Sequence, residues 1–158
     1  MKIWYFIFIL SSLNLQAQIS LEKFNSIFNE NPKPVLLYFS TNWCNYCMIQ
    51  KKQLEKDDEL LQILNNDIYF IEFDAETNES IIFLNKKYEP KSNKKTHPFL
   101  EEFTDKNEQI SYPYWVLISK DYKIEMTYTG LIKNKPLKLL LKKYLQKPLF
   151  LDLQKSLN

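Results

Sequence analysis

The chain has 158 residues, of which 45% are hydrophobic and 15% aromatic, and its formal net charge at pH 7 is +2. This length supports one domain with a hydrophobic core, and the apolar content excludes an intrinsically disordered protein. A nearly neutral net charge without a long basic block gives no indication of a nucleic-acid-binding surface.

Residues 1–17 have the pattern of a secretory signal peptide. Lys2 precedes an apolar run over residues 3–10, and Ala17 places a small residue at the expected cleavage position. The run is much shorter than the roughly 20 residues of a membrane-spanning helix. We therefore expect a mature domain over residues 18–158 that is periplasmic or secreted, with no membrane span after cleavage. An uncleaved N-terminal anchor is the alternative.

Hydrophobic periodicity and proline positions predict the elements in the first half of the domain. Ser20 can cap the first helix, and Pro32 and Pro34 exclude a helix immediately before the next element. The expected elements, in chain order, are a helix over Leu21–Phe28, a buried strand over Val35–Phe39, a helix from Cys44 to about Lys56, a short helix from Asp57 through Leu64, a strand over Ile68–Asp74 and a helix over Ser80–Tyr88 that Thr77 caps.

The second half of the domain begins with a polar, lysine-rich stretch and ends with an amphipathic pattern. Pro136 and Pro148 are expected to start and end the last helix. The expected elements are a loop over Glu89–Lys95, a short helix over His97–Thr104, an antiparallel hairpin of Tyr114–Ser119 and Ile124–Thr129, a helix over Leu137–Leu145, and a docked or frayed tail over Leu149–Asn158.

Cys44 and Cys47 are the only cysteines, and they fall at the start of the helix predicted after the buried strand. Unpaired backbone N–H groups and the helix macrodipole at this position favour a thiolate over a thiol. Cys44, the more N-terminal and more exposed residue, is the expected attacking nucleophile. Cys47 is the expected resolving thiol, which closes the disulfide and releases the partner. Trp43 would cover one side of the pair, and no cofactor is needed because the two sulfurs carry the electrons.

The cysteines have two alternative roles, a structural disulfide and a metal site, and the one histidine of the chain has a candidate role beside them. A structural disulfide closing so small a loop would contribute only about 2 kcal/mol. Zinc needs four ligands, and the chain offers one histidine beyond the two cysteines, although Cu(I) on two thiolates remains open. That histidine, His97, could shuttle a proton to Cys44, but its place before Pro98 favours a helix N-terminal residue.

The residues around the cysteines resemble the active site of the thioredoxin superfamily, whose signature is Trp-Cys-x-x-Cys after a buried strand. Pro113 ahead of an apolar strand and Gly130, the only glycine, match two further family positions. The resemblance covers about residues 21–145 and implies a three-layer α/β/α sandwich with a central mixed sheet. Residues 89–111 form a helical insertion before the proline, similar to that of exported bacterial thioredoxin-like proteins.

By this resemblance, Pro113 is a cis-proline that packs against the cysteine pair, whereas an edge-strand proline is the alternative. The backbone of Tyr112 would then be free to pair with an extended substrate, so Trp43, Tyr112 and Pro113 are the expected substrate-binding residues. The implied function is a monomeric thiol–disulfide oxidoreductase that reduces or isomerises protein disulfides and needs an upstream thiol partner. A thioredoxin-fold chaperone or Cu(I) chaperone without redox turnover is the alternative.

Two positions depart from the family pattern. Thioredoxins carry a buried aspartate six residues before the first cysteine and a lysine paired with it, where this chain has Tyr38 and Phe70. Water or a nearby acid such as Glu72 would then have to activate Cys47. The dipeptide Asn45-Tyr46 between the cysteines, a position that tunes the reduction potential in the family, also differs from the Gly-Pro of thioredoxin.

Overall fold

The computed structural model describes residues 21–105 and 109–156, with side chains through residue 146. The expected signal peptide lies outside these residues. Within them, no helix is both long enough and apolar enough to cross a membrane.

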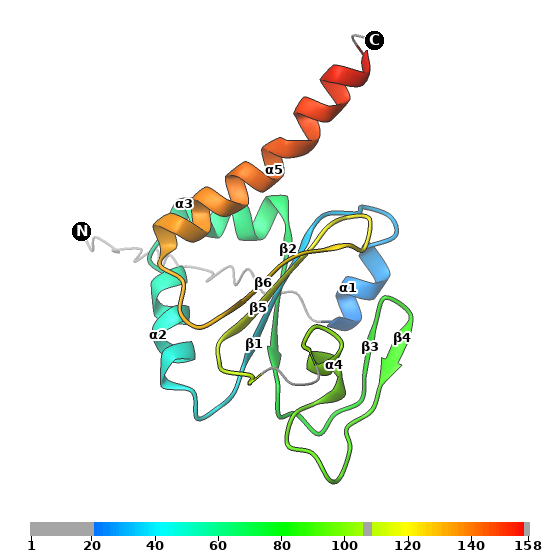
Figure 1. Cartoon of the computed structure of the whole chain (residues 1–158), viewed down its shortest axis with the longest axis vertical. Coiled ribbons are helices and arrows are strands. Elements are labelled where there is room, and N and C mark those ends of the chain that lie inside the picture. The colour runs from blue at the N-terminus through cyan, green and yellow to red at the C-terminus, as the bar shows by residue number, and fades with distance from the viewer. Residues whose placement is uncertain (1–20, 106–108, 157–158) are drawn as a thin grey trace, which may run out of the picture.

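A four-stranded mixed sheet forms the centre of the domain, in the order β2-β1-β5-β6 (Figure 1). Strand β1 pairs in parallel with β2 and antiparallel with β5, and β5 pairs antiparallel with β6. The strands are β1 (Val35–Ser40), β2 (Tyr69–Asp74), β5 (Tyr114–Ile118) and β6 (Ile124–Thr129). All six residues of β1 are buried, as expected for a strand covered on both faces.

Helices cover both faces of this sheet (Figure 1). Helices α2 and α5 lie on one side, and α1, α4 and the small β3–β4 sheet lie on the other. The helices are α1 (Leu21–Ile27), α2 (Asn45–Leu54), α3 (Asp58–Gln62), α4 (Pro98–Glu101) and α5 (Asn134–Ser156), and a π-helical stretch, Ile63–Asp67, follows α3. The predicted three-layer sandwich with a mixed central sheet is therefore confirmed.

Side-chain alternation along β1 separates the core into two clusters. Leu37 and Phe39 face the α1 and α4 side. Leu36 and Tyr38 face the other side, in the cluster that contains both cysteines. The cysteine pair is therefore packed into only one of the two helical layers.

Tyr38 links β1 to the helix that carries Cys47. Its side chain is fully buried, and its ring packs edge-on against Trp115, with ring centroids 4.5 Å apart. Its hydroxyl donates a hydrogen bond to the Cys47 carbonyl oxygen at 3.1 Å. Burial, and to a smaller extent the charge of Glu72, raises the pKa of Tyr38. The hydroxyl therefore stays protonated and acts as a donor.

The helix predicted over Ser80–Tyr88 is wrong: the segment forms the antiparallel hairpin β3 (Ile81–Phe83) and β4 (Lys86–Tyr88). Leu84 and Asn85 connect the strands with φ angles of 49° and 65°, values that suit a two-residue type I′ turn and not a helix. The side chain of Asn25 in α1 accepts a hydrogen bond from Leu84 N–H at 3.0 Å and also bonds to a carbonyl in β3. These contacts with α1 outweigh the apolar pattern that resembled a helix.

The prediction that Pro148 ends the last helix is also wrong, because α5 continues to Ser156. Its C-terminal end extends away from the rest of the domain (Figure 1). Proline removes one backbone hydrogen bond, but the leucines and lysines around it are good helix formers. The capping role predicted for Asp57 is confirmed, since its carboxylate accepts a hydrogen bond from Leu60 N–H at 3.1 Å.

We expect Asn85→Val to lower the free energy of unfolding by about 1–2 kcal/mol, because a β-branched residue is strained at positive φ. Asn85→Gly is the matched control and should leave stability nearly unchanged, since glycine adopts this conformation freely. Urea denaturation of the oxidised protein measures both values. Equal losses in the two variants would contradict the turn assignment.

We expect Tyr38→Phe to lower the free energy of unfolding by about 1 kcal/mol, because the variant keeps the ring packing and loses one buried hydrogen bond. Tyr128→Phe, on the exposed side of β6, should change it by less than about 0.5 kcal/mol. Urea denaturation compares the two variants. A Tyr38→Phe protein as stable as wild type would show that the bond to Cys47 contributes nothing.

Candidate active site

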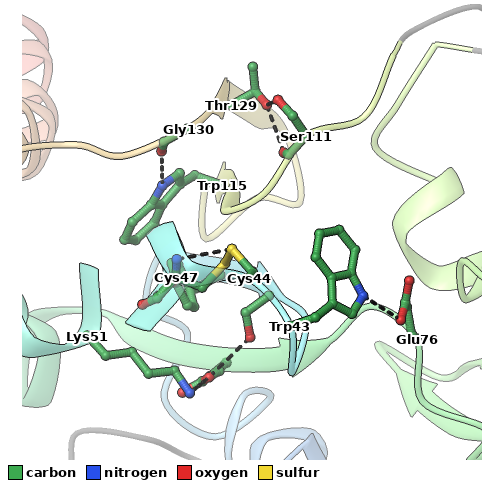
Figure 2. The surroundings of a disulfide bond; sticks show 12 residues. Trp43, Cys44, Cys47, Lys51, Glu76, Ser111, Trp115, Thr129 and Gly130 are labelled. Atoms are coloured by element: carbon green, nitrogen blue, oxygen red, sulfur yellow. Dashed lines mark hydrogen bonds and ion pairs between the residues drawn. A yellow bond between two sulfur atoms is a disulfide. The ribbon is translucent and has the colours of Figure 1, made fainter. Parts of the chain in front are cut away.

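The cysteines lie where β1 ends and α2 begins, and they form a disulfide in this structure (Figure 2). Their sulfur atoms are 2.07 Å apart and their Cα atoms 5.2 Å apart. Strand β1 leads through residues 41–43 directly to Cys44, so the sheet determines where the pair sits. The predicted position of the pair at a helix N-terminus is confirmed.

Cys44 is the N-cap residue of α2. Its sulfur accepts a hydrogen bond from Cys47 N–H at 3.0 Å, which satisfies one of the backbone donors that a helix N-terminus leaves unpaired. In the reduced protein the same N–H and the positive end of the helix dipole would face a Cys44 thiolate. This geometry favours the charged form of Cys44, as an attacking nucleophile requires.

Both cysteines are nearly covered, with 4% of Cys44 and 2% of Cys47 exposed. The difference in exposure that we expected between them is therefore small. Around them, four large apolar side chains are exposed, and we call them the apolar rim: Trp43, Tyr46, Met48 and Ile49. Such a rim beside a covered disulfide suits a large, partly apolar partner better than a small polar molecule.

Trp43 lies beside Cys44, and its indole N–H donates a hydrogen bond to a Glu76 carboxylate oxygen at 2.9 Å (Figure 2). Its ring meets the ring of Tyr112 edge-on, with centroids 5.9 Å apart. The structure thus brings together two of the three residues predicted to bind substrate.

The third of these residues, Pro113, is buried and follows a cis peptide bond from Tyr112. Burial raises the pKa of Tyr112, whose ring packs against the cluster that contains both cysteines. Within the described residues, Tyr112 makes no backbone–backbone hydrogen bond. The substrate-binding roles of Trp43, Tyr112 and Pro113 stay predictions.

Trp115 and Gly130 form the opposite side of the site, and no sequence pattern predicted the bond between them. The indole N–H of Trp115 donates to the Gly130 carbonyl at 3.1 Å (Figure 2). Gly130 N–H donates to the Pro113 carbonyl at 2.7 Å. Gly130 has a φ of 98°, a conformation that side chains disfavour, which accounts for the only glycine of the chain.

Gln50 is a second residue that the sequence analysis missed. It is fully buried, and its side-chain amide donates to the Ile132 carbonyl at 2.9 Å and accepts from Ile132 N–H at 2.8 Å. These two bonds tie α2 to the segment before α5. The available signal was a lone uncharged polar residue at the apolar positions of α2, between Cys47 and Leu54.

His97 has a structural role on the other side of the sheet. Its Nδ1 atom accepts a hydrogen bond from Phe99 N–H at 3.1 Å, and Nε2 lies 3.2 Å from the Glu79 carbonyl, to which it donates. Burial lowers the pKa of His97, which favours this neutral form. The interpretation as a helix N-terminal residue is confirmed. The ring packs on Phe73, in the cluster that does not contain the cysteines, so the proton-shuttle alternative is wrong.

Among the described residues, no group of three or more His, Cys, Asp and Glu side chains is arranged to hold a metal ion.

The chain matches the family model of the thioredoxin-like domain over residues 23–145. Among solved structures it is similar to a DsbH oxidoreductase, with 17% identity, a TM-score of 0.50, and coverage of 82% of this chain and 83% of that one. It is also similar to chloroplastic thioredoxin z, with 15% identity, a TM-score of 0.50, and coverage of 80% and 90%.

The C-terminal domain of DsbD from Neisseria meningitidis, in its reduced form, has 17% identity, a TM-score of 0.49, and coverage of 75% and 88%. No curated protein sequence matches. Structural likeness at these identities shows the fold alone, whereas the family model spans most of the chain and agrees with the cysteine pair at the start of α2. The protein belongs to the thioredoxin-like domain family.

Proposed function

We propose that the protein is an exported thiol–disulfide oxidoreductase that reduces or isomerises disulfides in protein substrates. The observation that carries the proposal is the Cys44–Cys47 disulfide at the N-terminus of α2, where Cys44 sulfur already accepts the Cys47 N–H. The apolar rim around this disulfide supports a protein as the substrate.

The reaction proceeds by two exchanges. The Cys44 thiolate attacks a substrate disulfide, one substrate sulfur leaves as a thiolate, and a mixed disulfide forms on Cys44. The Cys47 thiolate then attacks the Cys44 sulfur, the Cys44–Cys47 bond forms, and the second substrate sulfur leaves as a thiolate. The substrate gains two electrons and the cysteine pair loses two, so an upstream dithiol must reduce the pair again.

Substrate binding in this proposal uses Trp43, Tyr112 and Pro113. The backbone of Tyr112, which makes no backbone–backbone hydrogen bond within the described residues, would pair with an extended substrate segment beside the disulfide. Export rests on residues 1–17, which would be removed as a signal peptide to leave a domain over residues 18–158. A periplasmic or secreted location would allow the disulfide to persist.

We expect reduced Cys47→Ser protein to accumulate a mixed disulfide with disulfide-containing substrate proteins such as insulin, because Cys44 attacks the substrate disulfide but no second thiol resolves the product. Cys44→Ser is the matched control and should trap none. Both variants should lose at least about 100-fold of the insulin-reduction rate. Non-reducing electrophoresis and mass spectrometry identify the trapped species. Trapping by Cys44→Ser instead would reverse the assigned roles of the two cysteines.

The reduction potential of the pair, equilibrated in graded glutathione buffers, tests the direction of electron flow. We expect a value between those of thioredoxin and protein disulfide isomerase, about −270 mV and −180 mV, as reduction or isomerisation requires. A value near −120 mV would identify an oxidant and contradict the proposed direction. If the cysteine pair does not exchange with glutathione and the protein takes up Cu(I) stoichiometrically, the results would contradict the enzyme and favour a metal-binding module.

A further inference from the structure

A cavity of about 390 Å³ lies beside Cys47, where β1 and β2 end against α2. Three ionisable side chains from two elements line it together with Cys47: Lys51 of α2, and Glu72 and Asp74 of β2. Lys51 is the only cation among the residues that line this cavity. Cys47 therefore lines the same cavity as one cationic side chain and two carboxylates.

The periodicity of the two elements explains why these groups meet. Phe70 lies on the face of β2 that packs with the cysteines, and Glu72, two residues later, continues that face. Lys51 follows Cys47 by four residues in α2, so both lie on the same side of the helix. Strand and helix thus bring Glu72 and Lys51 together beside Cys47.

The Glu72 carboxylate is held in place by contacts from both sides. It forms an ion pair with Lys51. It also accepts a hydrogen bond from the Ser40 hydroxyl at 3.2 Å. Only 17% of its side chain is exposed, compared with 45% for Lys51. A carboxylate that is paired, hydrogen-bonded and largely covered keeps a defined position relative to the thiol.

The charged and titratable groups around Glu72 come from four directions. Lys51 faces it from α2 and the Tyr38 hydroxyl from β1, whose pKa the charge of Glu72 helps to raise. Asp74 lies on the same strand, and Glu22 and Glu79 line a neighbouring cavity that Glu72 also borders. Lys51 is thus the one cation among these groups, and it lines the same cavity as Cys47.

Tyr38 cannot accept the proton of Cys47. It occupies the position at which the family's buried acid was expected, but its hydroxyl stays protonated and donates to the Cys47 carbonyl. Resolution still requires that the Cys47 thiol lose its proton before attack. Glu72 is the carboxylate that both lines the cavity with Cys47 and pairs with its cation.

We propose that Glu72, positioned by Lys51 and Ser40, is the proton acceptor for the Cys47 thiol in the resolving step. This inference rests on the proposed function. The thiol proton passes through the solvent of the cavity to the Glu72 carboxylate, and the Cys47 thiolate attacks the Cys44 sulfur. The Cys44–Cys47 bond forms, the bond from Cys44 to the substrate breaks, and the substrate sulfur leaves with the electron pair and takes up the proton.

Lys51 makes this transfer favourable because it pairs with Glu72 and lines the same cavity as Cys47. Before the transfer the negative charge is on the carboxylate, and afterwards it is on the sulfur, so Lys51 remains opposite one anion throughout. The transfer moves a charge within the cavity and does not create an unpaired one, which avoids most of the desolvation cost of a new buried charge.

The experiment isolates the resolving step. The reduced protein reacts with an aromatic disulfide that releases a coloured thiolate twice, first when Cys44 attacks and then when Cys47 resolves the mixed disulfide. Stopped-flow absorbance from about pH 5 to pH 9 gives both rates as functions of pH. In wild type, we expect the second rate to rise and level off at a lower pH than in a variant without the carboxylate.

We expect Glu72→Gln to slow the second release about 10-fold or more at neutral pH and to move its pH profile to higher pH. The first release should change by less than about twofold, since Cys44 does not use this cavity. Glu55→Gln, which removes the same charge from an exposed site at the end of α2, is the matched control and should follow wild type. Glu72→Asp keeps a carboxylate and should restore much of the wild-type profile.

Three results would overturn the inference. A Glu72→Gln profile that superimposes on wild type would assign the proton to water. A slower second release without a shift along the pH axis, or no recovery in Glu72→Asp, would assign Glu72 a purely structural role. If wild type itself shows no exchange with the aromatic disulfide, the proposed function fails as well, and that outcome is separate from the other two.

Discussion

The buried Tyr38 side chain is the constraint on which the arrangement of the site depends. It occupies the central strand, packs against Trp115 from β5 and donates a hydrogen bond to the Cys47 carbonyl in α2. One side chain therefore fixes the helix that carries Cys47 relative to the sheet. Because burial raises the pKa of this phenol, its hydroxyl stays protonated and acts as a hydrogen-bond donor in the core.

The alternation of side chains along the sheet then assigns different tasks to its two faces. One face packs the cysteine pair, α2 and α5, and its strand ends carry the polar groups that border Cys47. The other face holds a large cluster of aromatic rings around Phe99. Phe83 of the β3–β4 hairpin packs against Phe99, and His97 packs against Phe73. The cysteine pair and the residues of the insertion around Phe99 therefore lie on opposite faces of the central sheet.

Errors in the sequence analysis fell where tertiary contacts decide local structure. Residues 81–83 have the apolar composition of a buried helix or a strand, and short apolar runs do not distinguish the two. Asn25, distant in sequence, settles the choice by bonding to the Ile82 carbonyl in β3 and to Leu84 N–H at the start of the turn. Likewise, Pro148 predicts the end of a helix, but α5 continues past it because the residues on both sides are good helix formers.

The sequence by itself determined where the main strands lie along the chain and the place of Cys44 and Cys47 at a helix start, because hydrophobic periodicity and capping act over only a few residues. Only the tertiary structure decided how distant residues combine. Gln50 with Ile132 and Lys51 with Glu72 are partners from separate elements, so no local pattern could predict them. Their pairing depends on strand register and on where α2 crosses the sheet, which are properties of the packed domain.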